Sequence, residues 1–413
     1  MLVGTSRIDI TPGYTTDLSG YGGREQPALG VRHQIFMRAA VFEANGNRLA
    51  VLSAEILEYP RPLVEEIRRR VATELDTPVE HVCFSVTHTH YAPAVIPMYG
   101  GGRVCERFQQ EVMDYACRAA KEALRSLAPM RLKRGKATLD IASNRRNPGG
   151  TPCDDTVQVL AAFGSDDQPR LMMVLYACHP VCLSPADRRV SGDFCGVACS
   201  VLEAKHEGCT TLFLNGCAGD INPRKEYRFS PEGMERAGRR MADAVLGIEF
   251  ENVRGEELAG KAARVELPYE RLESGRIRRE LDEIENLGEL DDAWRAKRAW
   301  LQCMRTWSYP DSMPVAMQLL RLGELQWLTL SGEVLWGIRL QIVAERPDLW
   351  IAAYCNGGHG YISTGPAQEE GGYEPDSSNW YFQRPPLVRG TGEMLGEAAI
   401  TFTAATGSST NGA

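Results

Sequence analysis

The sequence predicts an α/β fold with mixed sheets, and three observations support this. Segments typical of strands and of amphipathic helices alternate along the 413 residues. Hairpin turns between neighbouring strands are frequent, so parallel and antiparallel pairs should occur together. No linker rich in proline or serine divides the chain. We therefore expect one interwoven domain over residues 1–405, followed by a disordered Gly/Ser/Thr/Asn-rich tail over residues 406–413.

The individual elements follow from turn residues and hydrophobic periodicity. Residues 38–57 predict a β-hairpin, because Asn45-Gly46 favours a tight turn between two apolar segments. Residues 62–75 predict a helix, because apolar residues recur at every fourth position. The same criteria predict strands at 82–86, 156–163, 171–178, 211–214, 315–322, 325–331 and 349–354, and helices at 105–127, 197–207, 232–247, the segment before 345, and 391–404.

Residues 274–306 differ from the rest of the chain, because they are charged and helical and carry none of the motifs seen elsewhere. The pattern is interrupted near Gly288. We interpret this segment as a helical excursion or a lid.

The composition excludes several classes of function. With 46 basic and 54 acidic residues the net charge is −8, which argues against nucleic-acid binding and against attraction to anionic lipid. The longest apolar run is too short to cross a bilayer, and no secretory leader is visible. The twelve cysteines form no Cys-x-x-Cys pair, which favours buried thiols in a reducing compartment. We therefore expect a cytoplasmic protein acting on a small molecule, without a nucleic-acid or membrane partner; homo-oligomerisation stays open.

Histidines follow two of the predicted strands. In an extended chain, residues i and i+2 point to the same side, so His88 and His90 should face one spot at a strand end. His179 follows another apolar strand, and Pro180 should end that strand. Neutral imidazole is a common ligand of zinc. Each histidine alone could instead be a solvated or core residue, but the three together favour a metal site.

Three further segments carry polar groups at strand ends. The glycine-rich loop 215–223 offers Asn215 and Asp220, which we predict to contact the substrate. Asp220 could also support a metal ligand or bind a metal itself, and a well-capped turn is the alternative. Glu333 could complete a tetrahedral site, or it could stabilise a helix N-terminus. The glycine-rich loop 356–361 could place Tyr361 over a site.

Taken in order, these motifs resemble the neutral/alkaline ceramidase family in its N-terminal catalytic domain. The matching segments are VGTSRIDITP (3–12), GYG (20–22), SVTHTH (85–90), NR (144–145) ahead of NP (147–148), HP (179–180), SGD (191–193), GDINP (219–223), GE (332–333) and NGGHGY (356–361).

The resemblance implies hydrolysis of an amide bond by a zinc-activated water. The zinc ligands that it implies are His88, His179, Glu333 and Tyr361. Bound zinc lowers the pKa of water toward ~7 and can polarise a carbonyl.

Three further residues take roles from the same resemblance. Arg145 matches an arginine that recognises the polar head of the substrate. His90 and Tyr373 become candidates for stabilising the oxyanion or protonating the leaving group.

Two departures from the family pattern shift the expected substrate. Asn222 stands where the family has a serine, which excludes a serine acyl-enzyme there. The chain also ends soon after the helix at 391–404, without the further C-terminal β-sandwich of ceramidases. We therefore expect a small soluble amide rather than ceramide. A metal-dependent esterase, lactonase or phosphoesterase, and a non-catalytic binding homologue, remain the alternatives.

Overall fold

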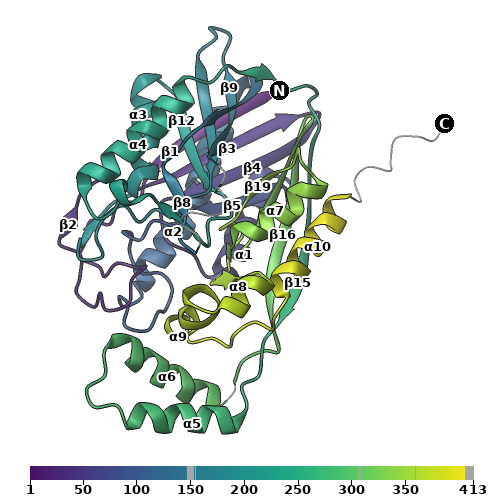
Figure 1. The fold of residues 1–413 in the computed structure, drawn as a ribbon. Coiled ribbons are helices and arrows are strands. Elements are labelled where there is room, and N and C mark those ends of the chain that lie inside the picture. The colour runs from purple at the N-terminus through teal and green to yellow at the C-terminus, as the bar shows by residue number, and fades with distance from the viewer. Residues whose placement is uncertain (147–152, 154, 307, 359, 405–413) are drawn as a thin grey trace.

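The computed structural model describes residues 1–146, 153, 155–306, 308–358 and 360–404 (Figure 1). The predicted tail 406–413, the NP segment 147–148 and His359 lie outside the described residues. The strands are β1 (Leu2–Asp9), β2 (Gly30–Val31), β3 (Phe36–Ala44), β4 (Asn47–Ala54), β5 (Val82–Val86), β6 (Ala128–Pro129), β7 (Arg131–Thr138), β8 (Ala142–Asn144), β9 (Thr156–Phe163), β10 (Pro169–Tyr176), β11 (Arg189–Val190), β12 (Thr210–Asn215), β13 (Ile221–Pro223), β14 (Glu251–Asn252), β15 (Leu258–Pro268), β16 (Ser312–Leu322), β17 (Leu325–Leu330), β18 (Glu333–Val334), β19 (Trp350–Ala352) and β20 (Tyr361–Ile362). The helices are α1 (Arg61–Leu75), α2 (Glu106–Arg125), α3 (Asp193–Lys205), α4 (Pro231–Leu246), α5 (Ser274–Glu285), α6 (Asp292–Thr306), α7 (Trp336–Glu345), α8 (Gly365–Glu370), α9 (Ser378–Phe382) and α10 (Thr391–Ala404).

Two five-stranded mixed sheets form the centre of the fold. The first has the order β5-β4-β3-β1-β6, and the second has the order β12-β10-β9-β7-β14. Both contain antiparallel pairs and one parallel pair, β4 with β5 and β10 with β12. The predicted hairpin is the β3–β4 pair, and its turn places Asn45 and Gly46 at φ 52° and 77°, as a type I′ turn requires. The predicted mixed α/β class is therefore confirmed.

The two sheets pack face to face, with helices on their outer faces. Alternate residues of β3 show this: Ala40 and Phe42 pack with Leu171 and Met173 of β10 between the sheets. The opposite face of the first sheet is covered by α1 and α2, while α3 and α4 cover the second sheet. Figure 1 shows α3 and α4 lying together along one flank of the molecule.

A third, four-stranded sheet in the order β15-β16-β17-β19 joins this core, and α7 and α10 pack together beside it. Between β15 and β16 the chain leaves the sheet to form α5 and α6, which lie at one end of the molecule next to α9 (Figure 1). These two helices share a small apolar cluster of their own that includes Trp300 and Met304. The segment predicted as a helical excursion or lid contains α5 and α6, and the break between them lies at the interruption predicted near Gly288.

Small differences from the predicted bounds occur beside the site. The strand expected to reach residue 178 ends at Tyr176, because the backbone N–H of Cys178 bonds the Asn215 side chain instead of continuing the ladder. The helix expected from residue 197 begins earlier, at Asp193. Within the described residues, no helix combines the length and the apolar character that crossing a membrane would need.

Candidate metal centre

Four side chains converge from the ends of different strands. His88 lies just beyond β5, and His179 lies three residues beyond β10. Glu333 and Tyr361 begin the two strands of the short parallel pair β18–β20, where they are direct register partners. All four residues are buried. The topology therefore brings residues from across most of the chain to one place.

The donor atoms of these residues have the spacing of a metal site. One carboxylate oxygen of Glu333 lies 3.2 Å from Nε2 of His88 and 3.1 Å from Nε2 of His179. The Tyr361 hydroxyl lies 3.5 Å from Nε2 of His179. Bonds of about 2.0–2.1 Å in a tetrahedral zinc site place neighbouring donor atoms about 3.3 Å apart. The observed separations match that spacing.

Backbone carbonyls fix the orientation of both imidazoles. Nδ1 of His88 bonds the carbonyl of Leu57 at 2.8 Å, and Nδ1 of His179 bonds the carbonyl of Ala218 at 2.6 Å. Since a carbonyl only accepts, each Nδ1 carries the proton and each Nε2 presents its lone pair to the centre. Metal-ligating histidines are held in this way.

The electrostatics also favour a cation at the centre. Burial alone raises the pKa of the Glu333 carboxyl, but His88 and His179 outweigh it and hold that pKa well below its ordinary value. Burial lowers the pKa of His179 to about 4, partly offset by its bond to Glu333. The Glu333 carboxylate and the lone pairs of the two imidazoles face one another at about 3 Å in a buried place. Such an arrangement is costly unless a positive charge lies between these groups. The residues present fit a bound divalent metal.

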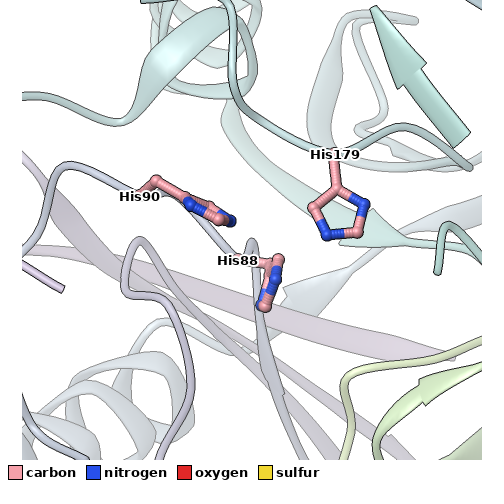
Figure 2. Close-up of side chains that lie close together, drawn as sticks. All are labelled: His88, His90 and His179. Atoms are coloured by element: carbon pink, nitrogen blue, oxygen red, sulfur yellow. The ribbon is translucent and has the colours of Figure 1, made fainter. Parts of the chain in front are cut away.

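His90 lies beside this group without a partner for its ring. Figure 2 shows His88 and His90 coming from one segment and His179 from another, with the three rings close together. One ring nitrogen of each can be chosen so that all lie within 4.8 Å of one another. Both ring nitrogens of His90 are buried and make no hydrogen bond among the described residues. Burial, and then the charges of His88 and His179, hold the pKa of His90 well below its ordinary value. A neutral imidazole with both nitrogens free can bind a ligand or help to hold the metal.

The metal centre opens into a cavity of about 350 Å³. Aromatic rings and a few polar groups form its wall. The described residues that line it are Gly20, Tyr21, Gly22, His90, Met98, Arg145, His179, Val181, Pro185, Asn222, Arg228, Phe229, Tyr361, Tyr373 and Tyr381. The ring centroids of Tyr361 and Tyr373 lie 5.6 Å apart, edge to face. The volume lies near the lower end of the range for small-molecule sites.

Arg145 lies on the cavity wall and is held by several partners. It donates to Glu374 at 2.6 Å and to the carbonyl of Gly219 at 2.7 Å. Its guanidinium carbon lies 5.5 Å from the ring centroids of both Tyr361 and Tyr373. The charge of Arg145 is therefore balanced by Glu374, while its planar face remains next to the two tyrosines.

The structure does not place Asn215 and Asp220 on the described cavity wall, where contact with substrate was expected. The Asn215 amide donates to the carbonyls of Thr87 and Cys178. Asp220 accepts from the Asn144 side chain and from the backbone N–H of Trp336. Both side chains are buried, and these bonds tie together the loops beside the candidate metal centre.

Several residues near the site were not predicted from the sequence. The Tyr354 ring lies 4.5 Å from the ring of His88, and the Glu58 carboxyl is buried beside Glu333. Burial and the charge of Glu333 raise the pKa of Glu58, which Arg384 partly offsets. Tyr381 reaches the cavity from α9. None of these residues stands in a motif, so only the folded chain reveals them.

Comparison with known proteins identifies the family. A family model described as neutral/alkaline non-lysosomal ceramidase, N-terminal, matches residues 1–226. Neutral ceramidase from Pseudomonas aeruginosa has a similar fold, with a TM-score of 0.74 and 19% identity over 98% of this chain and 74% of that chain. A second structure, a ceramidase complexed with C2, has a TM-score of 0.76 and 18% identity over 98% of this chain and 75% of its own. No curated protein matches the sequence. Because the family model covers more than half of the residues, the chain belongs to the neutral/alkaline non-lysosomal ceramidase family.

Proposed function

We propose that this protein is a zinc-dependent hydrolase that cleaves an amide bond of a small soluble substrate. The observation that carries the proposal is the buried set of donor atoms at 3.1–3.5 Å, with both histidine tautomers fixed. Family membership supports amide-bond hydrolysis. The cavity of about 350 Å³ supports a small substrate.

In this proposal His88, His179, Glu333 and Tyr361 hold one zinc ion. When bound, zinc makes a water nucleophilic near neutral pH and polarises the scissile carbonyl. The backbone carbonyls behind both histidines keep their Nε2 atoms directed inward. The sequence thus supplies a preformed site that needs little reorganisation when metal binds.

The cavity wall supplies the groups that act on the substrate. His90, neutral at pH 7, can donate one ring N–H to the developing negative charge on the carbonyl oxygen. Tyr373, at the mouth, is the candidate for protonating the leaving amine. Arg145, fixed by Glu374, orients the polar end of the substrate.

Metal analysis of single variants tests this assignment. Changing His88 or His179 to alanine should remove both zinc and activity. Changing His90 to alanine should keep zinc near one per chain and lower kcat, because His90 contacts substrate and does not ligate. Loss of zinc from that variant would instead support a three-histidine ligand set. His206→Ala, at the end of α3, is the matched control and should retain both properties.

A substrate panel tests the reaction itself. N-acyl amides, p-nitrophenyl esters and phosphate esters should be compared by kcat/KM on zinc-loaded protein. We expect amides to be preferred over phosphate esters. Removal of the metal with a chelator should abolish this preference. Turnover of phosphate esters alone would replace the amidohydrolase proposal. Zinc binding that raises thermal stability without any turnover would identify a binding protein.

We also propose a reducing, cytoplasmic location. All twelve cysteines are described and free, and eight of them are buried. Proteins of oxidising compartments more often pair their cysteines. Fractionation of the native host would test this proposal directly.

A further inference from the structure

The cavity beside the metal centre has an unbalanced positive charge. Two of its described lining residues are arginines, Arg145 and Arg228, and none is aspartate or glutamate. Arg145 is neutralised by Glu374, which lies behind the wall. The remaining charge therefore belongs to Arg228.

Arg228 forms no ion pair in the part of the chain that the structure describes. Its guanidinium carbon lies 4.6 Å from the ring centroid of Phe229, which also lines the cavity. Its Nε is buried and makes no hydrogen bond. An arginine supported by a ring and lacking a carboxylate partner has its bidentate donors free for a ligand.

A second arginine adds to the same charge. Arg24 is buried, with 5% of its surface exposed, and donates to the backbone carbonyls of Ser19 and His90. Its guanidinium carbon lies 4.9 Å from the Tyr21 ring, on the cavity wall. No described carboxylate forms an ion pair with Arg24. Burial raises the pKa of the Tyr21 hydroxyl, and among the charges that act on it Asp193 raises that pKa further while Arg24 and Arg228 lower it.

Two carboxylates whose charges act on Tyr21 and Arg24, those of Asp193 and Asp187, already have other partners. Asp193 is fully buried and accepts hydrogen bonds from the backbone N–H groups of Cys182 and Phe194. Asp187 accepts from Arg32 and Arg189. Neither carboxylate forms an ion pair with Arg228 or Arg24. Among the described residues Arg228 has no ion-pair partner, so a ligand carboxylate could take that place.

We propose that the substrate carries a carboxylate and that Arg228, on the cavity wall, binds it. None of the described lining residues is acidic. The inference rests on the proposed amidase function and names its substrate class: an amide with an anionic group a few bonds from the scissile bond. A cavity of this volume is roughly 9 Å across if taken as a sphere, so one small molecule reaches both ends. Neutral lipid amides would leave Arg228 unpaired and desolvated, which is costly.

Matched substrate pairs test the proposal on zinc-loaded protein. N-benzoylglycine is compared with the neutral N-benzoylethanolamine, and N-phenylsuccinamic acid is compared with butyranilide. The two pairs place the carboxylate on the amine side and on the acyl side respectively. We expect at least one pair to show a tenfold or greater kcat/KM preference for the anion at low salt, and that preference should fall as salt is raised.

Variants of Arg228 separate recognition from a structural role. Arg228→Gln should reduce the anion-to-neutral ratio at least tenfold, and Arg228→Lys should restore part of it. Arg240→Gln, an exposed arginine on α4 away from the cavity, should keep the wild-type ratio. A wild-type preference for the neutral partner in both pairs, or an unchanged ratio in Arg228→Gln, would overturn the inference.

Calorimetric binding of N-benzoylglycine distinguishes this inference from the proposed reaction. If no amide is hydrolysed, yet N-benzoylglycine binds wild type at least tenfold more tightly than Arg228→Gln, the reaction is wrong and the anion site stands. If amides are hydrolysed and both proteins bind the ligand equally, the reaction stands and the anion site is wrong.

Discussion

Replacing Gly20 by alanine should disable catalysis while leaving the metal in place. Gly20 has φ +103°, and a Cβ added there would lie 2.5 Å from Cγ of His90. Carbon atoms in contact lie about 3.5 Å apart or more, so the His90 ring would have to move by about 1 Å. Displacement of a catalytic group by about 1 Å costs on the order of a hundredfold in rate. We therefore expect kcat/KM to fall about a hundredfold.

The zinc content should not change, because His90 is not one of the proposed zinc ligands. The added Cβ would also lie 2.7 Å from Cβ of His90, so ring rotation alone would not relieve the overlap and the His90 side chain would have to shift as a whole. The assay is kcat/KM on the best amide of the panel, with zinc per chain measured on the same preparation.

A matched control removes the effect of backbone strain. Gly390 has a similar φ of +86°, and a Cβ there would meet no atom within 4 Å. Both alanine variants should lose about 1–2 kcal/mol of stability from the left-handed backbone. Only Gly20→Ala should lose activity. Equal kcat/KM in the two variants, or loss of zinc from Gly20→Ala, would refute the role given to His90.

Three further predictions concern buried groups elsewhere. Burial raises the pKa of Asp193 from 3.8 to about 6 although backbone N–H groups oppose it, so the native state keeps a proton that the unfolded chain has lost. The free energy of unfolding should therefore fall by about 3 kcal/mol as the pH rises from about 4 to above 6. In urea unfolding, Asp193→Asn should lack this dependence of stability on pH. The same pH dependence in wild type and variant would contradict the assignment. Arg38 is buried between Glu55 and Glu203, and Glu203 also pairs with Arg7. Arg38→Met should therefore leave the buried Glu55 carboxylate without an ion-pair partner and destabilise the protein by about 3–5 kcal/mol, seen as a lower Tm; an unchanged Tm would argue against this ion network. A thiol reagent should titrate twelve cysteines after denaturation but no more than the four half-buried ones in the native protein, and rapid native reaction of more than four would be inconsistent with the packing.

Local patterns predicted the elements well because the causes were local. The β3–β4 turn needs two residues at positive φ, and Asn45-Gly46 supplies them. The helix α1 follows from apolar residues at helical spacing, four of which, Val64, Ile67, Val71 and Leu75, are buried. Strand β3 is buried on both faces, and the period of two sends Ala39 and Val41 to one apolar cluster and Ala40 and Phe42 to the other. In each case the information lies within about fifteen residues.

The surroundings of the site could not be predicted in the same way. Glu58 follows a strand like many other glutamates, and only packing places it beside Glu333. Tyr354 contacts His88 because the chain after β19 returns to β5. Arg228 stands out because it has no ion-pair partner among the described residues, which a linear sequence does not show. Long-range contacts decide which polar residues become neighbours.

Asn215 and Asp220 illustrate the same limit and explain how the metal centre keeps its shape. The Asn215 amide bonds the backbone of both Thr87 and Cys178, so one side chain ties together the loops that carry His88 and His179, the two proposed histidine ligands. Asp220 accepts from the backbone N–H of Trp336, three residues beyond Glu333, the proposed carboxylate ligand. Metal sites depend on ligand distances held within about 0.2 Å, which three separate sheets would not hold by themselves. A polar residue in a glycine-rich loop at a strand end can either contact the substrate or hold the ligand loops in place. Asn215 and Asp220 are buried, and their polar atoms bond main-chain groups or Asn144. These bonds favour the second role for both residues.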